Sequence, residues 1–525
     1  MCSTVKHTVS GYKSNSFDLT AFHFLRNPYF LYPKIMFMTF GKIALSKKGM
    51  PILSAFFLLF ILGSCNKNND FTPNVLDLEN SKFKNVAKKA LSDKELLGKY
   101  IYFDASLSAT AGQFARGGAM TLSCASCHLP QQGYAGFESQ GQANRGNREW
   151  GLIPGGFKSG IGEGAVTGAF GGRKPPSASY ATFSPILNLP KDGKELGDEY
   201  EGGLFWDGRA TGAVLGNPAA EQAGGPFLSD KEHNFNTTTG RRDVLMLIKN
   251  GSYYPLYKKV WGNDLDMLTA AENPSSPLVM KNYNNVAFSI AAYEASSDVN
   301  QFSSKYDDVI AKRASFTAEE ELGYKLIRSS KTKECGSSGC HGEKDRDGIA
   351  LFTDWGHDNI GLPWKAEYRK EEGLTKGEVD KGFYTTLTSG KLPKGLKVKD
   401  ANEHIGKFKT PSLRNVARGE GNKRYMHNGI FSSLEEVMHF YNTRDVKGAG
   451  WSPSAKADDK TKPDWRPWGA PEYAQTMEGS SELGNFGLSA KEEKAIVAFM
   501  RTLSDTRVVL PPPAYGAAAP APATN

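Results

Sequence analysis

Two short stretches of this 525-residue chain each place two cysteines ahead of an adjacent histidine. They are SCASCH and KECGSSGCHGEK, and their six key residues are Cys124, Cys127, His128, Cys335, Cys340 and His341. A cysteine–gap–cysteine–histidine pattern of fixed gap arises by chance about 0.001 times in a chain of this composition. Two such patterns are therefore not accidental, and the fold must bring each pair and its histidine together.

The spacing in SCASCH is that of a c-type haem attachment site. Two thiols three positions apart can form thioethers with the two haem vinyl groups, and the next residue then lies under the porphyrin as the proximal iron ligand. The alternatives are a thioredoxin-like dithiol or half a zinc site. No strand–turn–helix context and no second cysteine pair at zinc spacing supports them, so a haem held by Cys124, Cys127 and His128 is predicted.

The second motif has four residues between its cysteines instead of two. A bulged loop can still bring both thiols to the vinyl groups, and Gly336 and Gly339 permit the backbone angles that a bulge needs. A local disulfide between Cys335 and Cys340 is the alternative in an exported protein.

A repeated segment before each motif favours haem over the disulfide. LSDKELLGKYIYF and FTAEEELGYKLI both begin with a capping box, Ser92–Glu95 and Thr317–Glu320, and both carry Leu-Gly at the same offset. We therefore predict a duplicated haem domain, with residues 89–315 as the first copy and 316–507 as the second.

The expected fold class is mostly α, with two cytochrome c-like haem domains, long loops and little β. Helical periodicity is clear in RRDVLMLIKN, NVAFSIAAYEAS and SSLEEVMHFYN. SAKEEKAIVAFMRTL adds a further helix that opens with a capping box, Ser489–Glu492. The Pro/Ala-rich tail, residues 508–525, is predicted to be disordered.

The N-terminal region is predicted to be an export leader. Lys47 and Lys48 precede MPILSAFFLLFILGSC, which has the charged region, apolar core and small residues of a signal segment. The apolar run is short for a membrane span. LGSC resembles a bacterial lipobox, which would leave Cys65 lipid-anchored after a leader of residues 1–64, followed by a polar tether over 65–88. A buried apolar segment with a chance cysteine is the alternative.

The charge distribution argues against a nucleic-acid partner. The formal net charge is +8, but residues 1–64 carry +6 of it, which leaves +2 for the rest of the chain. No basic cluster with interleaved aromatic residues appears.

Beyond these motifs, the chain resembles the bacterial di-haem cytochrome c peroxidase family, including the enzyme that matures the tryptophan-derived quinone of methylamine dehydrogenase. The matching pieces, in family order, are LGKYIYFDASLS, SCASCH, RKPPSASYA, LFWDGRA, AEQAGGPF, GKFKTPSLRNVA, RYMHNGIFSSLEEV and IVAFMRTL, which span roughly residues 90–507. The resemblance implies a peroxidatic N-terminal haem on His128 and an electron-relaying C-terminal haem on His341.

The resemblance also implies roles for residues between the two cysteine motifs. Trp206 matches the tryptophan between the haems, and Gln222 and Glu232 match the distal-pocket pair. A carboxylate above the iron can move a proton between the peroxide oxygens, and an amide can orient the peroxide. Core packing of Trp206 and a solvated turn at Glu232 are the alternatives. His233 stands where many relatives have Met, and no role follows from the sequence.

The ligands opposite the proximal histidines depart from the common family pattern. Many relatives carry a distal histidine after the first motif, but no histidine lies between His128 and His233. We predict that the peroxidatic haem lacks a histidine sixth ligand and needs no reductive activation. On the C-terminal haem, Tyr441 stands where many relatives have Met, and a phenolate would lower the haem potential. Met438 or His439 would replace it after a register shift, and a packed core tyrosine is a further alternative.

Three further histidines and one lysine bear on the surroundings of the predicted haems. His427 matches a family histidine near the haems that hydrogen-bonds or contacts a propionate, whereas His357 and His404 are expected to be surface or structural. Relatives often bind calcium through an Asn side chain, but Lys174 stands at that position and would repel Ca²⁺. Calcium is therefore in doubt, and a homodimer, common among relatives, is left open.

These features predict a lipid-anchored di-haem peroxidase of the bacterial periplasm or cell envelope. It would reduce hydrogen peroxide to water with electrons from a small c-type cytochrome or a cupredoxin. Peroxide-dependent oxidation of a protein or organic substrate is the first alternative, which Tyr441 and the missing distal histidine favour. A non-catalytic electron carrier is the second, and Glu232 and Gln222 at family spacing argue against it.

Overall fold

The computed structural model describes residues 90–108, 122–136, 157–158, 160–166, 168–190, 200–333, 335–337, 339–343, 348–364, 378–446, 469–479 and 481–516. The chain divides into two compact units, residues 1–73 and 74–525, and every described residue belongs to the second. The predicted leader, the tether and the lipid-anchored Cys65 lie outside the described residues.

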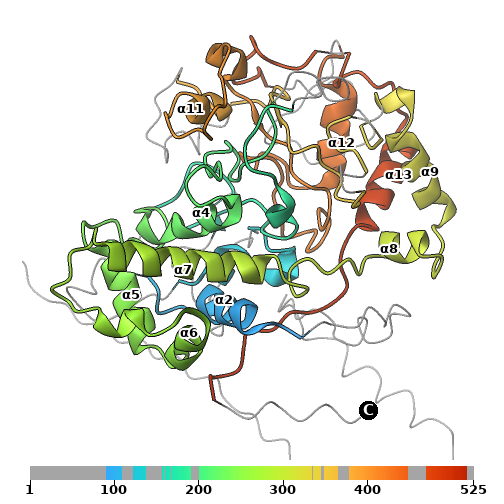
Figure 1. Ribbon diagram of the computed structural model, residues 1–525. Coiled ribbons are helices and arrows are strands. Elements are labelled where there is room, and N and C mark those ends of the chain that lie inside the picture. The colour runs from blue at the N-terminus through green and yellow to red at the C-terminus, as the bar shows by residue number, and fades with distance from the viewer. Residues whose placement is uncertain are drawn as a thin grey trace, which may run out of the picture. The chain divides into compact units, whose positions relative to one another are not determined.

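Helices dominate the described structure (Figure 1). In the first half they are α2 (Asp93–Phe103), α3 (Cys124–Cys127), α4 (Pro218–Gly224), α5 (Gly240–Asn250), α6 (Tyr254–Trp261) and α7 (Pro277–Glu294). In the second half they are α8 (Lys305–Ile310), α9 (Ala318–Ile327), α11 (Phe383–Leu387), α12 (Leu434–Thr443) and α13 (Ala490–Arg501). Short 3₁₀ turns lie at Pro130–Gln132, Ala181–Phe183, Pro226–Leu228, Asp264–Met267, Ser330–Thr332 and Ala401–His404.

Strands are short and few in the described ranges. The strands β1 (Phe157–Lys158) and β2 (Ile161–Gly162) form one antiparallel pair. The strands β3 (His357–Asp358) and β4 (Phe408–Lys409) form another. The predicted fold class, mostly helical with little β, is confirmed.

Each predicted capping box is present at the start of its helix. In α2, α9 and α13 the side chain of the N-cap residue accepts a hydrogen bond from the backbone N–H of the glutamate. The glutamate carboxylate in turn accepts one from the backbone N–H of the N-cap residue. The other predicted helical segments lie in α5, α7 and α12. The local start signals and apolar periodicity were therefore sufficient to place these helices.

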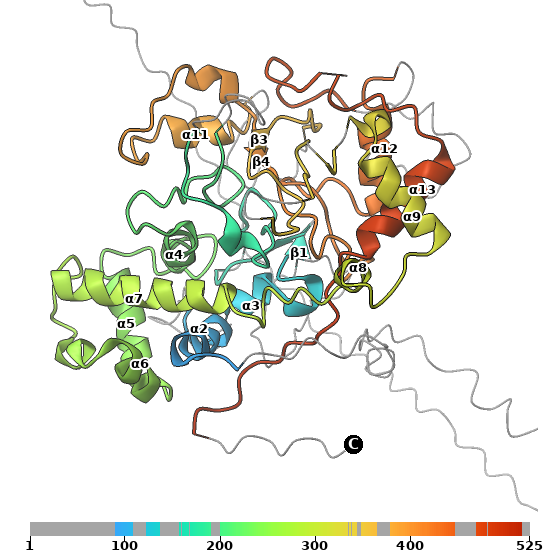
Figure 2. The ribbon, with the colours of Figure 1, turned by 45° about the vertical axis from the view of Figure 1, so that its right-hand side comes forward.

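The two helices that lead to the cysteine motifs pack in the same way. α2 lies along α7, and α9 lies along α13, in both views (Figures 1 and 2). A Cβ added at Gly98 of α2 would overlap the carbonyl oxygen of Ser289, and one at Gly323 of α9 would overlap that of Ala495. Each glycine thus lets two helix backbones approach closely, which supports the predicted duplication.

Each half of the described chain has its own hydrophobic cluster. One draws its buried residues from between Leu97 and Val299, and the other from between Tyr306 and Leu503. The boundary at residues 315/316 stays a prediction.

In the predicted tail, Val509 is buried and Tyr515 packs edge-on against Tyr100. No helix among the described residues has the length and apolar character needed to cross a membrane.

Candidate active site

The first cysteine motif forms the short helix α3, and His128 caps its C-terminal end. The backbone N–H of His128 donates to the Cys124 carbonyl at 2.9 Å. Its Nδ1 lies 3.1 Å from the Tyr134 carbonyl oxygen. A carbonyl only accepts, so Nδ1 carries the proton and Nε2 is left to bind a metal, as in most metal-binding histidines. Burial lowers the pKa of His128, which favours the neutral form that binds iron.

The second motif reaches the same arrangement through a wider loop. The backbone N–H of His341 donates to the Cys335 carbonyl at 2.9 Å, and its Nδ1 lies 3.1 Å from the Phe352 carbonyl oxygen. Cys335 and Cys340 form no disulfide. The two additional residues therefore enlarge the loop without changing how the histidine is held.

The role expected for Gly336 needs correction. Its φ does not lie in the left-handed region, so the bulge does not use that freedom. Its N–H donates to the Ile327 carbonyl at 2.8 Å, and an added Cβ would lie 3.0 Å from the Ile327 side chain. Close packing against the end of α9 is what favours a small residue here. Gly339 has a neighbour outside the described residues, and its role stays a prediction.

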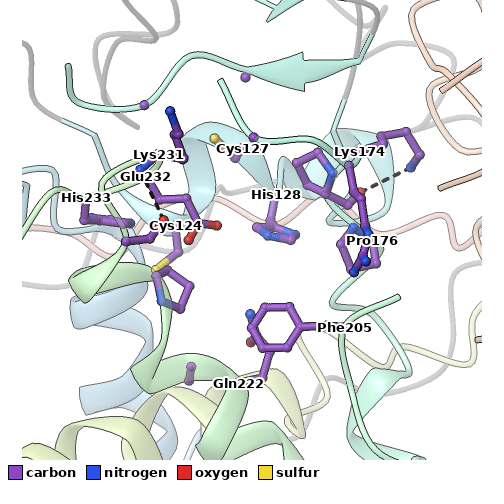
Figure 3. Close-up of a pocket in the computed structure, with 18 of the residues that line it drawn as sticks. Cys124, Cys127, His128, Lys174, Pro176, Phe205, Gln222, Lys231, Glu232 and His233 are labelled. Atoms are coloured by element: carbon purple, nitrogen blue, oxygen red, sulfur yellow. Dashed lines mark hydrogen bonds between the residues drawn. The ribbon is translucent and has the colours of Figure 1, made fainter. Parts of the chain in front are cut away.

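A cavity lies beside each motif. The first measures about 420 Å³ and the second about 450 Å³, within the usual range for cofactor sites. Each cavity has the two cysteines and the adjacent histidine of its motif in its wall. Figure 3 shows Cys124, Cys127 and His128 around the first. The two thiols of the motif and the available Nε2 of its histidine, at a cavity of this size, fit a c-type haem in both places.

The predicted distal pair lies at the first cavity. Gln222 comes from α4, and Glu232 from the loop that follows the Pro226–Leu228 turn. Both line the cavity that contains His128 (Figure 3). Burial raises the pKa of Glu232, against the opposing effects of Arg209 and Ser229. A carboxyl with a raised pKa holds its proton more readily near neutral pH, as a general acid must.

Trp206 lines both cavities. Its Nε1–H donates to the Lys174 carbonyl at 2.6 Å, and its own carbonyl accepts from the Lys409 N–H at 2.8 Å. The side chain is 8% exposed. Trp206 therefore lies in the walls of both cavities and is also a packed, hydrogen-bonded residue. Its position agrees both with a tryptophan between the haems and with core packing.

Tyr441, on α12, lines the second cavity together with His341. Burial raises its pKa, and the nearby thiols of Cys340 and Cys335 add to this. Met438 instead belongs to the hydrophobic cluster of the second half, and Nδ1 of His439 lies 3.1 Å from Glu493 Oε1. Of these three candidates only Tyr441 lines the cavity.

The other histidines lie as the sequence suggested. His427 lines the second cavity, and its ring stacks on Phe408 at 3.5 Å. His357 is buried and stacks on Phe383 at 3.8 Å, while His404 packs edge-on against Tyr200. These last two have structural positions.

Lys174 is buried in the wall of the first cavity. Its amino group donates to the Pro175 carbonyl at 3.2 Å. Burial lowers its pKa to about 8. The lysine is still mostly charged at neutral pH, so the argument against calcium is unchanged.

Among the residues of the first cavity without a role in the sequence predictions are His233 and Glu294. His233 follows Glu232 and lines the first cavity, with Nδ1 at 2.6 Å from the Leu107 carbonyl oxygen. Glu294, at the end of α7, is buried and lines the same cavity. Adjacency to Glu232 was the only sequence signal for His233, and Glu294 had none beyond its place in a helical pattern.

Comparison with known proteins shows similarity to one family of haem enzymes. Residues 92–315 match the family model described as "Di-haem cytochrome c peroxidase". Methylamine utilization protein MauG from Paracoccus denitrificans (strain Pd 1222) is 29% identical over 412 residues, which cover 78% of this chain and 88% of MauG. Cytochrome-c peroxidase IdrP1 from Denitromonas iodatirespirans is 26% identical over 443 residues, covering 80% and 83% of the two chains.

A solved structure gives the same result for the fold. The diheme peroxidase BthA from Burkholderia thailandensis E264 matches with a TM-score of 0.56 and 26% identity. The match covers 80% of this chain and 87% of BthA. Since the relatives span both cysteine motifs and both cavities fit the cofactor, the chain binds two c-type haems and is an oxidoreductase. Its residues 92–315 match the di-haem cytochrome c peroxidase family model, and the chain is similar in sequence and fold to di-haem peroxidases and to MauG.

Proposed function

We propose that this protein reduces hydrogen peroxide to water with electrons from a small c-type cytochrome or a cupredoxin. The observation that carries the proposal is the unequal lining of the two cavities. Glu232 and Gln222 line the first cavity with His128, and Tyr441 lines the second with His341. The first cavity therefore has a carboxyl and an amide suited to peroxide chemistry, and the second has a tyrosine side chain able to coordinate the iron.

In the N-terminal cavity the bound haem supplies the iron at which peroxide is reduced. Gln222 orients the peroxide through its amide, and Glu232 moves a proton from the near oxygen to the far oxygen, which leaves as water. Burial supports this role because it raises the pKa of Glu232, which helps its carboxyl to carry the proton that it delivers.

The C-terminal site is proposed to receive electrons and to pass them through Trp206. Trp206 lines both cavities. Two hydrogen bonds hold the residue, one from its indole Nε1–H and one to its backbone carbonyl. A Trp206→Phe variant keeps the ring packing but loses the donor to Lys174. We expect slower electron delivery to the N-terminal haem with no change in the two ferric spectra.

Stopped-flow mixing with hydrogen peroxide tests the function. We expect a rapid change in the N-terminal haem spectrum, then oxidation of two equivalents of a reduced small c-type cytochrome for each peroxide. A protein whose spectrum does not respond to peroxide would be an electron carrier only. A protein that responds to peroxide but does not oxidise the reduced cytochrome or a reduced cupredoxin would contradict the donor assignment.

A second function, peroxide-dependent oxidation of a protein or organic substrate, is favoured by one observation. Tyr441 lines the second cavity, whereas Met438 lies in the core. A tyrosinate ligand stabilises oxidised iron, which suits an enzyme that stores oxidising equivalents. An oxidised state that outlives mixing with reduced cytochrome but decays with an added aromatic substrate would favour this function.

We also propose that the protein is exported and held at the membrane by lipid on Cys65. Covalent haem attachment takes place outside the cytoplasm, and the leader pattern before Cys65 supports the anchor. Mass spectrometry of the mature N-terminal peptide tests this proposal. A diacylated Cys65 is expected, and an unmodified peptide that continues upstream of it would contradict the anchor.

A further inference from the structure

His233 is held in the same way as the two proximal histidines. Nδ1 of His128 and Nδ1 of His341 each lie 3.1 Å from a main-chain carbonyl oxygen. Nδ1 of His233 lies 2.6 Å from the carbonyl oxygen of Leu107. Because a carbonyl can only accept, this contact places the proton on Nδ1 and leaves the lone pair on Nε2.

The backbone around His233 is fixed independently of its side chain. The N–H of His233 donates to the Pro226 carbonyl at 3.2 Å, and the N–H of Glu232 donates to the Ser229 carbonyl at 3.3 Å. The carbonyl of Glu232 accepts from Ala165 at 2.7 Å. Both neighbouring side chains are thus presented to the cavity by one rigid turn.

The environment of His233 is that of a functional group. The residue is only 4% exposed, yet it lines the cavity with His128 and Glu232 (Figure 3). Its ring packs at a tilt against Phe227, with the ring centres 5.1 Å apart. An imidazole at this position adds a proton acceptor to the cavity wall, which an aliphatic or thioether side chain would not.

We propose that His233 is a second proton-transfer residue of the N-terminal haem cavity, acting through Nε2 alongside Glu232. Nε2 accepts the proton of the near peroxide oxygen, and this proton later returns to Glu232. The Glu232 carboxyl donates its own proton to the far oxygen as the O–O bond breaks. That oxygen takes the electron pair of the broken bond and leaves as water, and the enzyme's electron donor supplies the two reducing equivalents. This inference rests on the proposed peroxidase function.

Burial shifts the pKa values of His233 and Glu232 in opposite directions, which agrees with an accepting role for His233 and a donating role for Glu232. Burial lowers the pKa of His233 to about 4, so its imidazole is neutral and accepting at neutral pH. Burial raises the pKa of Glu232, so its carboxyl keeps its proton to higher pH. Neighbouring groups whose pKa values are shifted in this way suit one acceptor and one donor.

Cyanide binding tests the inference without turnover. Hydrogen cyanide must lose a proton to bind ferric iron, whereas imidazole binds without proton transfer. In the holoenzyme, His233→Met should slow cyanide association and the first spectral change with peroxide by roughly a hundredfold, the lower range for a general base. Imidazole association and both ferric spectra should be unchanged.

A second variant separates proton transfer from structure. In His233→Asn the side-chain amide can still donate to the Leu107 carbonyl, but nothing replaces Nε2. The inference expects cyanide association as slow as in His233→Met. Wild-type rates in His233→Asn would show that only the contact with Leu107 matters, and a changed ferric spectrum in either variant would make His233 an iron ligand. Each of these results overturns the inference.

The failure of this inference is distinguishable from that of the proposed function. If the wild-type protein binds cyanide but shows no response to peroxide, the peroxidase function fails while the cyanide comparison still tests His233. If peroxide is reduced at the wild-type rate in both variants, the function stands and His233 has no part in it.

Discussion

The two haem cavities hold their proximal histidines identically and differ in the walls opposite. His128 and His341 each donate a backbone N–H to the first cysteine's carbonyl, and each ties Nδ1 to a carbonyl 3.1 Å away. Besides these histidines, Gln222, Glu232 and His233 line the first cavity, and Tyr441 and His427 line the second. The shared part fits the cofactor in both cavities, and under the proposed function the residues that differ decide which haem reacts.

The largest expected effect comes from exchanging a group on one of these divergent walls. Glu232→Gln removes the proton-transfer carboxyl but keeps its shape, and should slow the reaction with peroxide by roughly 10²–10⁴-fold. Stopped-flow spectroscopy at saturating peroxide measures this rate. Tyr441→Phe in the other cavity is the matched control and should leave the rate unchanged. Equal losses in both variants would mean that the two walls do not differ in function.

Two buried carboxyls should give opposite pH dependences of stability. Burial raises the pKa of Glu294, in the first cavity, to about 8. Unfolding therefore releases its proton between about pH 4.5 and 8, and stability falls as pH rises through that window. Glu294→Gln should be more stable than the wild type by up to about 5 kcal/mol at pH 8.5 and nearly equal to it at pH 4.5.

Asp380, in the wall of the second cavity, provides the contrast. Burial alone would raise the pKa of its carboxyl, but the ion pair with Arg173 at 2.7 Å outweighs burial and lowers it. Its stabilisation is present above the unfolded pKa and is lost as the pH falls through the folded pKa. Asp380→Asn should destabilise the protein at pH 7 and less so in acid. Denaturant unfolding followed by far-UV circular dichroism measures both variants, and a pH-independent difference would contradict the assignment.

The shared packing of the two approach helices gives a smaller, symmetric prediction. Gly98→Ala and Gly323→Ala each place a methyl group against a backbone carbonyl on the partner helix. Each should lower stability by about 2 kcal/mol through overpacking, and Gly479→Ala, where a Cβ has room, should not. Thermal unfolding measures the three variants. A large effect in only one half would show that the two helix pairs tolerate overpacking differently.

The smallest expected effect is spectroscopic. Tyr441→Phe should change the ferric spectrum of the C-terminal haem and leave the N-terminal haem spectrum unchanged. Absorption and electron paramagnetic resonance spectra measure the two haems separately. An unchanged C-terminal spectrum would show that Tyr441 is a packed aromatic residue and no iron ligand.

Local signals in the sequence were sufficient for the helices and the haem motifs. Three capping boxes marked α2, α9 and α13, because a cap and its partner lie three residues apart. The family resemblance supplied Glu232 and Gln222, which single-sequence periodicity alone would have left in a surface turn and a short helix.

Cavity walls built from distant segments could not be predicted in this way. The sequence left Tyr441, Met438 and His439 open as ligands, and tertiary packing places Met438 in the hydrophobic cluster while Tyr441 lines the cavity. The carbonyl partner of His233 is Leu107, 126 residues earlier. Such partners depend on tertiary packing and leave no trace in local spacing.

The loop between Cys335 and Cys340 has a practical consequence for recognising haem proteins. Two more residues than usual are accommodated because the bond from the His341 N–H to the Cys335 carbonyl closes the larger ring. The number of residues between the cysteines therefore differs between the two motifs. The hydrogen bond from the histidine N–H to the carbonyl of the first cysteine is present in both. Searches that accept only the shortest spacing would count this enzyme as having one haem, and designers could lengthen such loops provided that closure is kept.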